Sequence, residues 1–175
     1  MHPLRSAAPG NAMRHPITAT LTAIACLGIA LPGAGAQTAR DLVGTWALES
    51  DTTTTPDGRT IQPFGPQPSG IAIFDSSGRF AIVNSRPDLP KFASNNRMRG
   101  TAAENEAIVH GSFAFFGTYS VANGVIVQHI EGGTWPAWNG TDQKRTISSF
   151  TANEQTWTTV PSFGGRSELH WKRMK

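Results

Sequence analysis

The chain has 175 residues, a formal net charge of +3, one cysteine and 38% hydrophobic residues, which fits one globular domain with a sizeable core. Two of the arginines lie in the first 36 residues, and the other 139 residues carry 13 basic and 12 acidic side chains. This balance, with only a short basic run at the C-terminus, excludes the broad basic surface of a nucleic-acid-binding domain.

The first 36 residues have the features of a secretory signal peptide. Arg14 and His15 precede an apolar run from Ile17 to Pro32, and a small-x-small sequence ends at Ala36. The run contains threonines and is shorter than the ~20 residues of a membrane span. We therefore expect cleavage near Ala36, a periplasmic or secreted protein, and no stable membrane insertion after cleavage.

Cys26 lies inside this apolar run. A lipid-modified cysteine is expected to follow a leucine three residues earlier, where this chain has Ala23, and a further apolar stretch begins at Leu27. We interpret Cys26 as an apolar residue of the signal peptide without a lipid. The mature domain, residues 37–175, then has no disulfide and no zinc–thiolate site. The pattern fits a translation start at either Met1 or Met13.

The rest of the chain consists of short β-rich runs separated by turns. The predicted strands are 42–50, 70–75, 79–85, 113–121, 125–132, 143–151, 155–161 and 167–172. Residues 56–59, 76–78 and 123–124 are turn sequences, and the proline-rich segment 63–68 is a rim loop. The only predicted helix is 101–110, with Thr101 as N-cap and Glu104 three residues later. The pattern predicts an all-β, up-and-down antiparallel barrel of about eight strands with one short helix.

Two terminal motifs support a closed barrel. Gly44-Thr45-Trp46 lies in the first predicted strand, and Trp171-Lys172-Arg173 ends the last one. In a closed barrel the first and last strands are neighbours, so a basic side chain from one can cover the Trp of the other.

Six short motifs are spread along residues 41–174: 42–46, 63–66, Gly117-Thr118-Tyr119, His129-x-Glu131, Gly140-Thr141-x-Gln143-x-Arg145 and Trp171-x-Arg173. Together they resemble the bacterial and fungal lipocalin-like domain proteins, over nearly the whole of this range. The resemblance implies a small calycin-type barrel with an internal cavity. It carries no catalytic residues over to this chain.

The segment 125–145 has the densest group of polar residues. One strand ends in His129 and Glu131, and after a Gly-, Pro- and Trp-rich turn the next strand opens with Gln143 and Arg145. Because strand side chains alternate, each of these pairs lies on one face. Symmetric pairing about the loop predicts Glu131 opposite Gln143 and His129 opposite Arg145.

The Asn123–Gly124 turn extends this face to the preceding strand, since a two-residue loop pairs Thr118 with His129 and Phe116 with Glu131. One face then carries Phe116, Thr118, His129, Glu131, Gln143, Arg145 and Ile147. The other carries Phe113, Phe115, Tyr119, Ile126, Ile130, Lys144, Thr146 and Phe150. The polar residues at 144 and 146 indicate that the second face meets water, so we predict that the first looks inward. The second face is also rich in apolar residues, and a single bulge would exchange the two.

We therefore predict an exported barrel that binds a small lipophilic or aromatic ligand with a polar or anionic end. Basic side chains would hold the anionic end, and aromatic side chains would stack on the apolar body. The predicted ligand-binding residues are Phe116, Thr118, His129, Glu131, Trp135, Trp138, Gln143 and Arg145. Two structural interpretations stay open: a solvated ladder on the surface, and a Glu131–Arg145 pair that closes the wall.

Two other functions remain as alternatives. In the first, His129 is a general base tuned by Glu131 or Asp142, and Arg145 holds an oxyanion, as in a cofactor-free isomerase, cyclase or lyase. In the second, the Trp135–Trp138 loop docks a protein partner. The sequence has no nucleophile motif, so we expect binding rather than catalysis, and no cofactor.

No metal site is expected. His129 and Glu131 with His110 or His170 are suitable ligand types but lack metal-site spacing. The glycosylation sequon at 139–141 is interpreted as a turn. Ligand identity and oligomeric state are left open.

Overall fold

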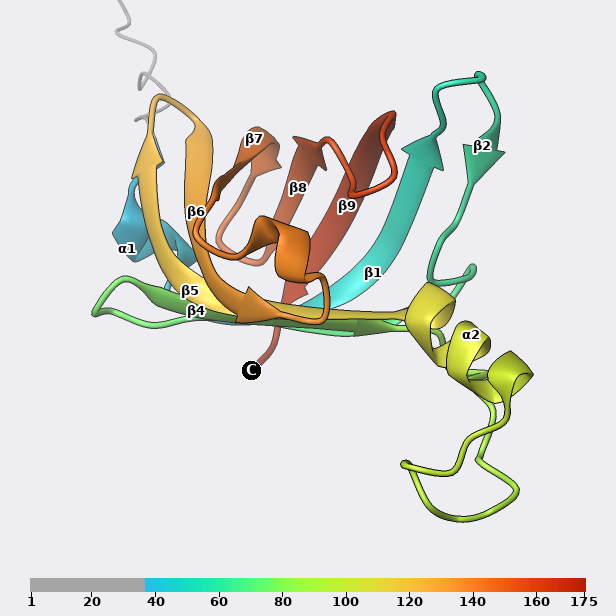
Figure 1. Cartoon of the computed structure of the whole chain (residues 1–175). Coiled ribbons are helices and arrows are strands. Elements are labelled where there is room, and N and C mark those ends of the chain that lie inside the picture. Colours follow the sequence, from blue (N-terminus) through green and yellow to red (C-terminus); the bar gives the residue numbers. More distant parts are fainter. Residues whose placement is uncertain (1–36) are drawn as a thin grey trace, which may run out of the picture. The chain divides into compact units, whose positions relative to one another are not determined.

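A computed structural model describes residues 37–175, and eight of its strands close an antiparallel barrel (Figure 1). Their order is β1 (Gly44–Thr54), β3 (Ser69–Phe74), β4 (Arg79–Ser85), β5 (Ser112–Ala122), β6 (Val125–Gly133), β7 (Asp142–Phe150), β8 (Glu154–Thr159) and β9 (Arg166–Arg173), and β9 pairs with β1. A short extra strand, β2 (Thr60–Ile61), pairs with the end of β1. The predicted barrel is confirmed.

The helical elements are short. They are α1 (Ala39–Leu42), α2 (Ala102–Gly111) and the 3-10 turn η1 (Pro136–Trp138). None of the helices within residues 37–175 has the length and apolar character needed to cross a membrane. The predicted signal peptide, with Cys26, lies outside the described residues.

Barrel closure involves the terminal Trp and Arg as predicted. Trp46 pairs with Arg173 across β1 and β9, and the guanidinium carbon lies 4.0 Å from the centre of the indole ring. Arg173 also donates hydrogen bonds to the carbonyl oxygens of Val43 and Asp41, each at 2.7 Å. Trp46 is fully buried, and its Nε1 donates to the carbonyl oxygen of Leu42. The seam is therefore fixed by stacking and by charge-assisted hydrogen bonds.

The local signals in the sequence are also confirmed. Asn123 and Gly124 have φ of 52° and 73°, the left-handed values of a type I′ hairpin turn. They bring Thr118 opposite His129, as predicted. At the start of α2, the Thr101 side chain accepts a hydrogen bond from the Glu104 amide, and the Glu104 carboxylate accepts one from the Thr101 amide.

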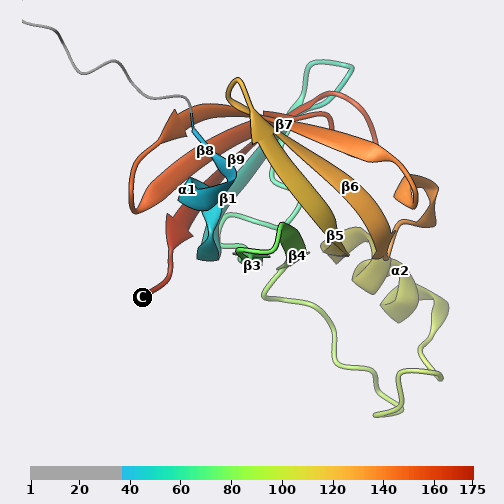
Figure 2. The ribbon, with the colours of Figure 1, turned by 90° about the vertical axis from the view of Figure 1, so that its left-hand side faces the viewer.

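The two ends of the barrel differ (Figures 1 and 2). α1 covers one end, where Leu42 is fully buried and the Tyr119 hydroxyl donates to the carbonyl oxygens of Ala39 and Asp75. The β3–β4, β5–β6 and β7–β8 turns lie at this end, because successive connections of an up-and-down barrel alternate between its two ends. α2, η1 and the β8–β9 loop lie at the other, open end. The helix predicted at 101–110 therefore lies at the open mouth of the barrel.

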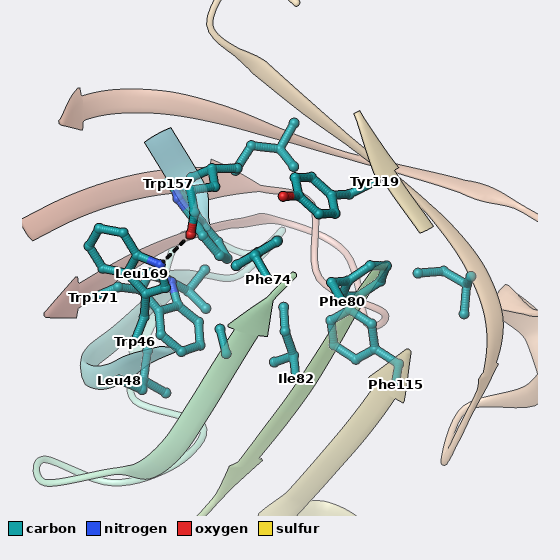
Figure 3. Packing of buried hydrophobic residues seen from close by; sticks show 14 of the residues in the cluster. Trp46, Leu48, Phe74, Phe80, Ile82, Phe115, Tyr119, Trp157, Leu169 and Trp171 are labelled. Atoms are coloured by element: carbon teal, nitrogen blue, oxygen red, sulfur yellow. Dashed lines mark hydrogen bonds between the residues drawn. The ribbon is translucent and has the colours of Figure 1, made fainter. Parts of the chain in front are cut away.

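The core is an aromatic cluster between these ends (Figure 3). Its larger side chains are Trp46, Phe74, Phe80, Phe115, Tyr119, Trp157 and Trp171. The Trp157 ring centre lies 5.0 Å from that of Trp171 and 5.8 Å from that of Phe74, which it meets edge-on. Aromatic pairs prefer edge-on or offset arrangements, so these contacts hold the rings in defined orientations.

The predicted register of β6 and β7 is wrong. His129 lies opposite Asp142, and Arg145 lies opposite Ile126. β6 continues to Gly133 along β5, and the η1 loop then returns the chain so that the Ile130 amide meets the Thr141 carbonyl. The connection is therefore asymmetric, and the strands are displaced by three residues from symmetric pairing. An odd displacement moves Arg145 to the face opposite that of His129.

Candidate ligand-binding cavity

The open end of the barrel leads into a cavity of about 660 Å³. Its wall is formed by inward side chains of β1, β4, β5, β7, β8 and β9. Its rim is formed by α2, η1 and the segments that follow β2 and β8. The lining is dominated by rings, which include Phe64, Phe113, Phe115, Trp138, Trp157 and Trp171.

A polar band crosses this aromatic wall from β7 to β1. We define it as Arg145, Thr159, Ser167 and Thr53. Arg145 Nη1 donates to the Thr159 hydroxyl at 2.7 Å, and the hydroxyls of Thr53 and Ser167 are 2.6 Å apart. Thr159 lies opposite Ser167, and Ser167 lies opposite Thr53, in the strand register. The four residues of the band therefore lie side by side on the adjacent strands β7, β8, β9 and β1.

Arg145 provides a buried positive charge in this band. Only 4% of the residue is exposed, and its guanidinium carbon lies 5.5 Å from the Trp138 ring centre and 5.8 Å from that of Phe115. Burial lowers the pKa of Arg145 to about 10, so the side chain is still protonated at neutral pH. The ion pairs within residues 37–175 do not include Arg145. An anion in the cavity would supply the missing partner.

Asp51 lies on β1, one inward position deeper than the polar band. The residue is 6% exposed, and its carboxylate accepts one long hydrogen bond of 3.4 Å from the Thr53 hydroxyl. Burial raises the pKa of Asp51 to about 6, against the smaller opposite effect of that hydrogen bond. The carboxyl group is therefore mostly ionised at neutral pH and becomes protonated in mild acid.

Two further polar atoms of the lining have no hydrogen-bond partner among the described residues. They are the Asn84 side-chain oxygen, an acceptor, and the Trp171 Nε1, a donor. Buried polar atoms normally have partners. Both atoms are therefore positions where a ligand could gain a hydrogen bond.

Of the eight predicted ligand-binding residues, three line the cavity: Trp135, Trp138 and Arg145. The prediction that the face with Phe116, Thr118, His129 and Glu131 points inward is wrong for β5 and β6. Phe116, His129 and Glu131 are exposed on the outside, and Thr118 lies on the same outer face. Gln143 is half-buried on the Arg145 side of β7 and donates to the Thr141 hydroxyl at 2.9 Å.

The outward-facing polar residues form a surface ladder. His129 Nδ1 lies 2.8 Å from an Asp142 oxygen, and their side chains are 49% and 59% exposed. Glu131 is paired with Arg79 rather than with Arg145. Among residues 37–175, His, Cys, Asp and Glu form no group of three or more that could hold a metal ion. The ladder is on the surface, away from the cavity, so His129 is not placed to act on a molecule inside the barrel.

The two Trp side chains of the Trp135–Trp138 loop lie in different places, one at the rim of the cavity and one in its wall. Trp135 is 45% exposed at the rim. Trp138 packs edge-on against Phe113 and Phe115, with ring centres 5.2 Å and 5.7 Å away. Only Trp135 is therefore available as an exposed docking anchor, and Trp138 belongs to the cavity.

Asp51 was not identified from the sequence, since the first predicted strand ends at Ser50. Simple alternation from Trp46 and Leu48 would also have placed Asp51 outside. A bulge between Leu48 and Ser50 shifts the register, so that Asp51 points inward beside Leu169. No residue pattern in β1 marks this bulge.

Comparison with known proteins agrees with this architecture. The lipocalin-like domain model matches residues 43–174. The chain belongs to the lipocalin-like domain family. This membership confirms the family resemblance of the six sequence motifs. No curated protein matches the sequence of this lipocalin-like chain.

Solved structures similar to this lipocalin-like domain have low sequence identity to it. A redesigned β-barrel has 16% identity over 81% of this chain and 98% of its own, with a TM-score of 0.42. A second redesigned barrel, bound to DFHBI, has 20% identity over 77% and 97%, with a TM-score of 0.38. Bovine odorant binding protein, in complex with a selenium-containing odorant, has 18% identity over 79% and 74%, with a TM-score of 0.39.

Proposed function

We propose that this lipocalin-like protein binds a small, largely apolar ligand whose anionic end is held by Arg145. The observation that carries the proposal is a buried guanidinium that faces an aromatic cavity and has no carboxylate partner among the described residues. Burying an unpaired charge is unfavourable unless a partner compensates it. A carboxylate or phenolate of the ligand would do so.

The size and lining of the cavity support the same class of ligand. Small-molecule pockets usually measure ~300–1,000 Å³ and are mostly apolar with a few orienting polar groups. The cavity of about 660 Å³, with the polar band on one wall and rings around it, has this character. The ligand body would contact Trp138, Trp157 and Trp171, whose fluorescence then reports occupancy.

The first prediction concerns Arg145. A panel of aromatic and fatty acids, each with its uncharged methyl ester, is titrated against the protein by tryptophan fluorescence. Arg145→Lys keeps the charge but loses the planar two-bond geometry, so we expect acids to bind ~10-fold more weakly or worse, and Arg145→Met to weaken them further. The esters should bind all three proteins with similar affinity.

Lys144→Met is the matched control, because Lys144 precedes Arg145 in the chain and lies on the outer face of β7. It removes a positive charge near the site without changing the cavity. Equal affinities of the acids for wild type, Arg145→Lys and Arg145→Met would contradict the proposal. So would an equal loss in Lys144→Met, which would point to a general charge effect.

We further infer that the protein is exported and that its mature form begins near Gln37. This is supported by the basic flank, the apolar run and the small-x-small sequence that ends at Ala36. N-terminal sequencing of the exported protein tests it. A first residue at Cys26, or an unprocessed N-terminus, would contradict it.

A further inference from the structure

We propose that Asp51 is a general base in the cavity, so that the barrel isomerises a carbonyl ligand without a cofactor. The substrate class is a small, largely apolar β,γ-unsaturated carbonyl compound, whose acidic C–H bond lies between the carbonyl group and a carbon–carbon double bond. This inference rests on the proposed function, because the reacting molecule must first bind in the barrel.

The placement of Asp51 and Arg145 is the first support. Both side chains line one cavity, and the polar band connects their levels, since Thr53 donates to Asp51 and Thr159 accepts from Arg145. They do not neutralise each other, because the ion pairs among residues 37–175 contain neither. A carboxylate and a guanidinium that share a cavity without pairing are each available to a bound molecule.

The surroundings of Asp51 make its carboxylate a stronger base than an exposed one. Leu169 lies opposite it on β9, and Trp157 and Trp171 contribute to the same wall. Burial raises the pKa of Asp51 to about 6, which is close to the neutral range in which general bases work best. Pairs of titratable groups with perturbed pKa values in one cleft are typical of catalytic sites.

Other titratable groups near Asp51 are few. The lining contains His110 on α2 and Arg145 on β7. On the neighbouring strand β9, Glu168 and His170 are exposed on the outside and are paired with each other. In the part of the chain that the structure describes, Asp51 is therefore the only carboxylate that lines the cavity.

The reaction needs no co-reactant. The Asp51 carboxylate takes the proton, forming an O–H bond as the C–H bond breaks. The electron pair of that bond forms a carbon–carbon double bond, and the carbonyl π electrons move to the oxygen. The Arg145 guanidinium stabilises the resulting enolate oxygen. Return of the proton from Asp51 to another carbon of the dienolate regenerates the carboxylate and completes an isomerisation.

The experiment uses 5-nitrobenzisoxazole, an aromatic carbon acid of suitable size. A base removes its ring C–H proton, the electron pair forms the nitrile, and the N–O bond breaks to give a coloured nitrophenolate. We expect wild type to accelerate this ring opening, and Asp51→Asn to lose ~100-fold or more of the rate. The wild-type rate should rise with pH through an inflection near 6, the pKa of Asp51.

Asp142→Asn is the matched control, because it removes an exposed carboxylate paired with His129 outside the barrel. It should keep the wild-type rate. An Asp51→Asn rate equal to that of wild type, or a wild-type profile without an inflection near pH 6, would overturn the proposal. The profile needs no variant, so it decides the matter even if Asp51→Asn does not fold.

The panel of acids and esters is titrated in parallel against wild type, the two Arg145 variants and Asp51→Asn. If acids still depend on Arg145 while the ring opening does not depend on Asp51, the base is refuted and the binding function stands. If neither acids nor esters bind, the proposed function itself fails.

Discussion

Asp51 and Arg145 are ionisable side chains inside a largely aromatic barrel, and each perturbed pKa reports a cost to folding. Burial raises the pKa of Asp51 and lowers that of Arg145, which in both cases disfavours the charged form. A barrel built only for stability would place apolar side chains at these positions. The two charges therefore reduce the stability of the empty protein, and an anionic ligand that pairs with Arg145 would restore part of it.

The pH dependence of stability follows from the pKa of Asp51. In the folded protein it is about 6, above the ~3.9 of an unfolded chain, so the folded state holds the proton more tightly. The resulting stabilisation is complete below about pH 4 and is lost as the pH rises through 6. The free energy of unfolding of Asp51→Asn, relative to that of wild type, should therefore increase by roughly 2–3 kcal/mol as the pH is raised from about 4 to about 7.

Urea denaturation of both proteins across this pH range measures the difference. Asp142→Asn, which changes an exposed carboxylate, serves as the control and should not reproduce the gain. Unfolding free energies of wild type and Asp51→Asn that change in parallel with pH would show that the carboxyl group is not desolvated.

At the scale of single elements, the sequence predicts structure well where the interaction is local. The Asn123–Gly124 turn requires left-handed backbone, and the capping box of α2 joins residues three apart, so both signals lie within a few residues. Strand positions follow from alternation in the same way. These elements are present with ends within a few residues of the predicted ones.

Long connections and bulges were not predictable, and they decide which side chains enter the cavity. The path of the η1 loop depends on the continued pairing of β6 with β5, a contact that involves residues about 20 positions apart. The β1 bulge depends on pairing with β9, at the other end of the chain. Arg145 does point inward as predicted, but it does not share a face with His129, which points outward. The inward position of Asp51 could not be predicted, because it depends on the β1 bulge.

At the scale of the whole molecule, barrel closure depends on the seam between β1 and β9. Trp46 is fully buried there beneath Arg173 and beside Phe150, whose ring centre is 6.0 Å away. Trp46→Ala should lower the free energy of unfolding by about 3–5 kcal/mol, because it leaves a large cavity and removes the stacking partner of Arg173.

Chemical denaturation of Trp46→Ala and of Trp135→Ala compares a buried with a half-exposed ring. The Trp135 variant should lose much less stability, since that side chain is 45% exposed at the rim. Similar losses in the two variants would show that the seam contributes no more to closure than a rim loop does.

The separation of the two ends of the barrel has a practical consequence. The chain leaves the last strand at the end that α1 and Leu42 cover, where Arg173 donates a hydrogen bond to the carbonyl oxygen of Asp41. α2, η1 and the β8–β9 loop lie at the opposite end (Figure 1), and the cavity opens between them. A label, fusion partner or sensor surface joined at Lys175 would therefore leave the entrance unobstructed. The protein can be immobilised through its C-terminus with its cavity facing the sample.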